Sequence, residues 1–108
     1  MKESEEYNFG RQRIDAILQG WQLENHDLVQ AALPEQLTHK QVQRARIGRR
    51  LTLGMMQKIT RILNEAALSR LSAEDAEAFC PYMHRDLFSY AKNYDEHWED
   101  PNATLYPR

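Results

Sequence analysis

The chain has 108 residues, 42% of them hydrophobic and 28% charged, with a formal net charge of -2. This composition is ordinary for one globular domain and argues against intrinsic disorder. Its apolar runs, such as residues 16–18, are too short to span a membrane, and the acidic residues 1–6 do not resemble a secretory signal. We therefore expect a cytoplasmic protein with no membrane partner, and the single Cys80 excludes an internal disulfide.

Apolar residues recur at spacings of three and four, without sustained alternation, so the chain is expected to be all-α. The first predicted helix follows a cap at Asn8 and runs to about Gly20. The second covers residues 25–33 and ends before Pro34, which cannot continue a helix. The apolar stripes of these two helices comprise Ile14, Ile17, Leu18, Trp21, Leu28, Val29 and Ala32.

A capping box marks the start of the third predicted helix. Thr38 can accept a hydrogen bond from a free backbone N–H, and Gln41 stands three residues later, where a capping box requires it. Leu37 can pack against Val42 across the first turn. A helix is therefore predicted over residues 38–47, followed by a glycine that suits a helix C-terminus.

A second threonine cap, Thr52, begins the fourth predicted helix, with Leu51 and Met56 placed to pack across its first turn. The apolar face of this helix continues through Ile59, Ile62, Leu63 and Ala66. A further helix begins at Ser72, where acidic residues follow in the first turn, and it must bend or stop at Pro81.

The last predicted helix covers residues 83–98, about four turns by the helical repeat. The apolar residues that repeat at helical spacing are Leu87, Ala91, Tyr94 and Trp98. Residues 1–6 and 101–108 are expected to be flexible ends. The sequence thus predicts a single domain over residues 1–108, with a helical core over residues 12–64 and an aromatic helical extension over residues 72–100.

Positive charge is concentrated in residues 36–64, which contain seven Lys or Arg residues and no acidic residue. Because the whole chain carries -2, the remaining residues sum to -9. Such a basic segment in an acidic chain indicates a surface that faces a polyanion. Acidic residues from other segments, such as Asp27 and Glu35, could instead neutralise it. The seven cations are Lys40, Arg44, Arg46, Arg49, Arg50, Lys58 and Arg61.

The string THKQVQRARIGRRLT has the order of a recognition helix, with a threonine cap, polar residues, a buried valine, a glycine and basic residues. With Leu28 and Val29 before it and the apolar helix after it, residues 12–64 resemble the Cro/C1-type (phage repressor-like) helix-turn-helix family. The resemblance implies a four-helix lambda-repressor-like helix-turn-helix bundle that binds double-stranded DNA as a transcription regulator. The segment from Leu28 to Thr38 is longer than is usual in this family, and Arg46 stands where many members carry an acidic residue.

The resemblance also implies which residues contact DNA. Residues 40 and 44 share one face of the third helix, opposite Val42 and Ala45, so one face can pack while the other enters a major groove. Lys and Arg can donate to guanine, and Gln can pair with adenine, whereas phosphate contacts fix the register. The residues expected to read bases are His39, Lys40, Gln43 and Arg44. Those expected to contact phosphates are Arg46, Arg49 and Arg50.

Other site chemistries have little support in the sequence. Cys80 and His84 form the only pair of metal ligands at a suitable spacing, whereas a zinc site needs four ligands, so no metal or cofactor is expected. His97 lies among acidic residues that are more typical of a solvated cluster than of an acid-base site. We expect neither an enzyme nor a small-molecule substrate. The alternative function is a non-catalytic protein-interaction module, adaptor or antitoxin-like, that uses the same helices.

The aromatic residues after Phe79 admit two interpretations. A homodimer interface through Phe88, Tyr94 and Trp98 would bring two recognition helices to successive major grooves. Alternatively, this segment covers the open side of the helical bundle. The sequence leaves both interpretations open.

Overall fold

In the computed structural model, residues 8–107 are described. These residues form an all-α structure, as the sequence predicts, and their only β contact is an isolated bridge between Asn8 and Arg49. No helix in this range is long and apolar enough to cross a membrane. The elements are α1 (Arg13–Trp21), α2 (Asn25–Ala31), α3 (His39–Ile47), α4 (Leu53–Leu68), α5 (Ala73–Ala76), α6 (His84–Leu87) and the 3-10 helix η2 (Ala103–Leu105).

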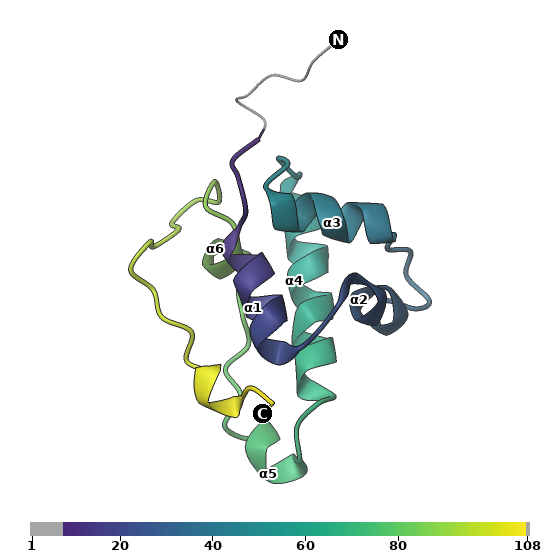
Figure 1. The fold of residues 1–108 in the computed structure, drawn as a ribbon, viewed down its shortest axis with the longest axis vertical. Helices are drawn as coiled ribbons and strands as arrows, with labels where there is room; N and C mark the ends of the chain where they lie inside the picture. Colours follow the sequence, from purple (N-terminus) through teal and green to yellow (C-terminus); the bar gives the residue numbers. More distant parts are fainter. Residues whose placement is uncertain (1–7, 108) are drawn as a thin grey trace.

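Helix α4 is the central element, and α3 lies across the end at which α4 begins (Figure 1). Helix α2 packs against both α3 and α4, and α1 packs against α3. Each helix buries an apolar stripe, which removes apolar area from water and provides most of the favourable free energy of folding. The largest fully buried apolar side chains are Trp21, Phe88, Ile14, Leu18, Leu28, Ile59, Ile62, Leu63, Leu87 and Val42.

The predicted boundaries of α3 and the start of α4 are confirmed. The Thr38 hydroxyl accepts from the Gln41 N–H at 3.0 Å, and the Gln41 side chain accepts from the Thr38 N–H at 3.0 Å. Gly48 ends α3 with φ 98°, and a Cβ on it would collide with the carbonyl oxygen of Gly10. Thr52 caps α4 by accepting from the Met55 N–H at 3.1 Å. The longest helix and the predicted recognition helix therefore begin where their caps require.

Helix α1 begins later than predicted, at Arg13, and the expected cap at Asn8 is wrong. Residues 8–11 instead run beside the end of α3, where the Phe9 N–H donates to the Gly48 carbonyl at 2.8 Å. Helix α2 starts at Asn25 as predicted and ends at Ala31, three residues before the proline.

The helix predicted over residues 83–98 is wrong beyond Leu87. Helix α6 has only four residues, and Phe88 after it is extended, with φ -123° and ψ 121°. Phe88 is fully buried, so it packs within the fold and is not displayed to a second copy. Residues 88–102 follow an irregular path along the side of α1 that faces away from α2 (Figure 1). The placement supports the interpretation that this segment covers the bundle.

Arg13 of α1 holds this irregular segment in place. Its guanidinium donates to the carbonyl oxygens of Asp86, at 2.9 Å, and Asp95, at 3.0 Å. The same group lies 4.5 Å from the ring centroid of Tyr94 and 5.0 Å from that of Trp98, within the range of cation-π attraction. The irregular segment is therefore fixed by contacts with Arg13, more than seventy positions earlier in the sequence, and not by the hydrogen bonds of the expected helix.

In the C-terminal segment, expected to be flexible, Leu105 and Tyr106 pack against the hydrophobic core. Asn102 is fully buried and exchanges two hydrogen bonds of 2.8 Å with the backbone of Cys80. The Tyr106 ring lies edge-on to Trp21, with centroids 5.4 Å apart. The other expected flexible end, residues 1–6, lies outside the described residues.

Candidate nucleic-acid interface

Helix α3 presents a polar face to solvent and buries the opposite one. Val42 and Ala45 have no exposed surface, whereas the four residues predicted to read bases are all exposed. These four residues are His39, Lys40, Gln43 and Arg44. The structure therefore brings together, on one exposed helix face, the residues that the sequence assigned to base contacts.

The cations of residues 36–64 differ in whether an acidic residue pairs with them. Lys40, Arg44 and Arg50 are exposed, and none forms an ion pair within residues 8–107. On α4, by contrast, Arg61 forms a bidentate pair with Glu35, with N–O distances of 2.6 and 2.8 Å. The hydrogen bond from Arg61 lowers the pKa of the Glu35 carboxyl. Neutralisation by acids from other segments thus applies to Arg61, whereas Lys40, Arg44 and Arg50 have no ion-pair partner among the described residues.

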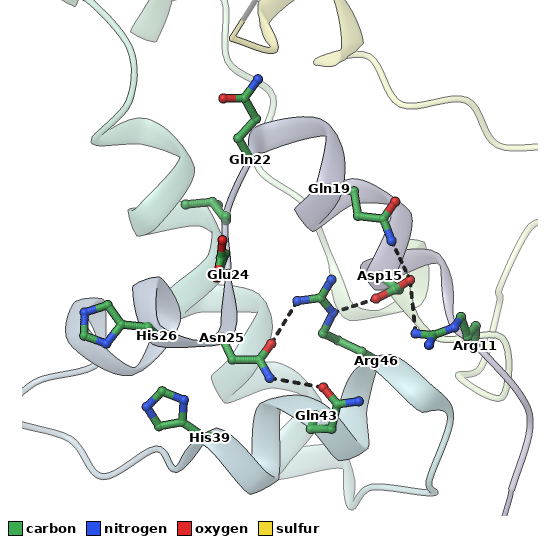
Figure 2. Close-up of a pocket in the computed structure, with 11 residues that line it drawn as sticks. Arg11, Asp15, Gln19, Gln22, Glu24, Asn25, His26, His39, Gln43 and Arg46 are labelled. Atoms are coloured by element: carbon green, nitrogen blue, oxygen red, sulfur yellow. Dashed lines mark hydrogen bonds and ion pairs between the residues drawn. The ribbon is translucent and has the colours of Figure 1, made fainter.

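Arg46, predicted to contact phosphate, points into the protein instead. Its Nε donates to Asp15 Oδ1 at 2.6 Å, and its Nη1 donates to Asn25 Oδ1 at 2.8 Å (Figure 2). The Arg46 side chain is 15% exposed and that of Asp15 is 7% exposed. Asp15 also accepts from Gln19 at 2.9 Å and lies 3.4 Å from Arg11. The guanidinium of Arg46 joins α1, α2 and α3, so we remove it from the expected phosphate contacts.

Arg49 and Arg50 follow Gly48 at the end of α3. Arg49 is half-buried, forms the backbone bridge with Asn8, and its carbonyl accepts from the Tyr90 hydroxyl at 3.3 Å. Arg50 is exposed. The turn that ends α3 therefore places Arg50 at the surface shortly after the helix.

An open polar groove of about 900 Å³ separates α1, the start of α2 and α3 (Figure 2). Gln43 lies on its α3 side, where its Oε1 accepts from Asn25 Nδ2 at 3.1 Å. His26 and His39 also line it, with their ring centroids 6.1 Å apart. No third His, Cys, Asp or Glu completes a metal cluster with them among the described residues. The groove therefore adjoins the exposed face of α3 and shares His39 and Gln43 with it.

Sequence reasoning missed the importance of Asp15 and Asn25. The one available signal was the position of Asp15, a charged residue between Ile14 and Ile17 on the apolar stripe of α1. A carboxylate at such a position must find a partner, because an unpaired buried charge is costly. The sequence did not show that the partner was Arg46, thirty-one residues later.

Comparison of the chain with protein-family models, with curated proteins and with solved structures found no match.

Proposed function

We propose that the protein binds double-stranded DNA sequence-specifically through the exposed face of α3, as a Cro/C1-type helix-turn-helix transcription regulator. One observation carries the proposal: Lys40 and Arg44 lie exposed, without an ion-pair partner in residues 8–107, on a helix whose opposite face is fully packed. A packed helix with free cations on its outer face suits a rigid element that must approach a polyanion.

The dimensions and chemistry of α3 suit a major groove, which admits one α-helix. Lys40 and Arg44 are four residues apart and so project from the same side of the helix. Arg44 can donate two parallel hydrogen bonds to guanine O6 and N7, and Lys40 can donate to the same acceptors. His39 and Gln43 flank this pair on the side of the groove between the helices.

Phosphate contacts would come from the turn after α3. Arg50 is exposed there, with Arg49 beside it, and contacts of this kind fix the register of a protein on DNA without reading sequence. Because Arg46 is held by Asp15 and Asn25, it supports the orientation of α3 and does not need to touch DNA.

The proposal is tested by selecting binding sites from a random duplex DNA library and measuring affinity for the selected site over a range of salt concentrations. Arg44→Ala is expected to cost roughly 1 to 3 kcal/mol of binding free energy and to relax specificity at one base pair. Arg50→Ala should weaken binding to all sequences and reduce the salt slope by about one. Arg61→Ala removes the same charge from a residue engaged with Glu35 and serves as the matched control.

Two outcomes would contradict the proposal. If Arg44→Ala and Arg50→Ala bind DNA like the Arg61→Ala control, the assigned face is wrong. If the wild-type protein binds no DNA even at low salt, DNA binding is excluded, and a protein-interaction module becomes the function to test.

A further inference from the structure

Four side chains form a hydrogen-bonded series that begins at a buried carboxylate and ends on the exposed face of α3. Asp15 accepts from Arg46 at 2.6 Å, Arg46 donates to Asn25 at 2.8 Å, and Asn25 donates to Gln43 at 3.1 Å. The series crosses from α1 through α3 and α2 back to α3 (Figure 2). It connects an internal ion pair to a residue at the proposed DNA-binding face.

The chemistry of the first two members determines the orientation of the other two. A guanidinium has only donors, so Asn25 must turn its Oδ1 toward Arg46. The Nδ2 of Asn25 has only donors, so it can bond to Gln43 only if the Gln43 Oε1 faces it. The oxygen and nitrogen of an isolated amide are interchangeable by rotation, but here the ion pair with Asp15 selects one orientation for both amides.

This orientation leaves the Nε2 group of Gln43 as the one available for a ligand. Nε2 has no acceptor within the described residues, whereas one of the two lone pairs of the Oε1 is taken by Asn25. A glutamine that reads adenine uses both groups, accepting from adenine N6 and donating to N7. To read adenine, the Oε1 would have to accept a second hydrogen bond beside Asn25, whereas Nε2 can donate without competition. The major-groove edge that offers two acceptors and no donor is that of guanine.

We propose that Asn25 is a specificity-determining residue, because it turns the Gln43 oxygen toward itself and leaves the Gln43 Nε2 as the favoured contact, which selects guanine where the sequence suggested adenine. This inference rests on the proposed DNA binding. Lys40 and Arg44 have only donors, and together with the outward Nε2 of Gln43 they favour a guanine-rich half-site.

The sharpest test is Asn25→Asp, which is nearly isosteric. An aspartate can accept from Arg46 with one oxygen and from Gln43 Nε2 with the other, so the Gln43 amide should turn and present its oxygen outward. Site selection is performed with the wild type, Asn25→Asp and Gln43→Ala; the last identifies the base pair that Gln43 contacts. At that base pair, Asn25→Asp should replace guanine by adenine or cytosine, whose exposed amino groups donate, with a change of roughly tenfold in relative preference.

Two controls isolate the effect. Gln30→Glu introduces the same charge on an exposed residue of α2 and should weaken binding without changing the selected base. Asn25→Asp combined with Gln43→Ala should select the same site as Gln43→Ala alone. Thermal unfolding of each variant, followed by circular dichroism, confirms that it is folded.

An unchanged guanine preference in Asn25→Asp would overturn the inference while leaving DNA binding established. The inference would also be overturned if Asn25→Asp combined with Gln43→Ala changed the base preference as much as Asn25→Asp alone, because the change would then not depend on Gln43. If the wild type selects no sequence, the proposed function fails first, and the inference fails with it.

Discussion

Replacing Arg46 by Met should destabilise the fold markedly. Methionine keeps the apolar stem of the side chain and removes the guanidinium. The change leaves the Asp15 carboxylate, whose side chain is 7% exposed, without its 2.6 Å partner. It also leaves Asn25 Oδ1 without a donor. Arg46 would then no longer join α1 to α2 and α3.

The expected loss is about 3 kcal/mol. Removing one member of a buried ion pair typically costs about 3 to 5 kcal/mol, because the other charge remains buried. The lower end applies here, since Asp15 keeps the hydrogen bond from Gln19 at 2.9 Å and the more distant Arg11 at 3.4 Å. In a domain of this size, 1 kcal/mol corresponds to roughly 4 to 8 °C in Tm, so the midpoint should fall by roughly 12 to 24 °C.

Urea unfolding followed by far-UV circular dichroism measures this loss directly. Arg61→Met is the matched control, because the Arg61 side chain is 49% exposed and its Glu35 partner is 45% exposed. Solvent screens that pair, so its loss should change the unfolding free energy much less. A double-mutant cycle with Asp15→Asn should show coupling between residues 15 and 46 of about 2 kcal/mol.

If Arg46→Met is no less stable than Arg61→Met, or if the cycle with Asp15→Asn shows no coupling, the pair of Arg46 and Asp15 does not stabilise the fold as expected. A variant that keeps its stability but loses DNA affinity with a lower salt slope would show that Arg46 contacts phosphate, as its sequence position suggested.

Two further predictions concern the C-terminal segment. The Tyr82 hydroxyl accepts from Trp21 at 2.9 Å and donates to Asp100 at 2.7 Å; burial, followed by the Asp100 carboxylate, raises the pKa of Tyr82. The folded state thus holds the Tyr82 proton more tightly than the unfolded state does. The contribution of this hydroxyl to the unfolding free energy is therefore full below about pH 10 and is lost as pH rises above it. The unfolding free energy should fall above pH 10, and it should fall less steeply with pH in Tyr82→Phe than in the wild type. If the two proteins show equal slopes, the Tyr82 hydroxyl is not the group responsible. Asn102→Ala should cost about 2 kcal/mol in urea unfolding, because it removes both hydrogen bonds between the fully buried Asn102 side chain and the backbone of Cys80, and a loss below about 0.5 kcal/mol would contradict the role of Asn102.

The starts of α3 and α4 were predictable because the interactions that define them are local. Thr38 and Thr52 each bond to an N–H three residues later, and Gly48 supplies a left-handed turn within the same stretch of chain. The buried faces followed from the 3.6-residue period, which needs no knowledge of the partner surface. The exposure of Lys40 and Arg44 followed from the same period, since Val42 and Ala45 occupy the opposite face.

The irregular path after α6 could not be predicted in the same way. Leu87, Tyr94 and Trp98 repeat at helical spacing, yet their positions depend on the buried core and on Arg13. Arg13 supplies two hydrogen bonds to backbone carbonyls and a cation beneath two rings, contacts that a continuous helix would not offer. Tertiary contacts of this kind override a modest local preference for helix.

The helical class, the boundaries of α3 and the exposed cations on it can therefore be predicted from the chain alone, because capping and periodicity act within a few residues. The contact of Arg46 with Asp15 and that of Asn25 with Gln43 arise only when the helices pack together. Those pairs join residues 31 and 18 positions apart on different helices. Hydrogen-bond partners at such separations depend on how the helices pack, and no local pattern in the sequence specifies that arrangement.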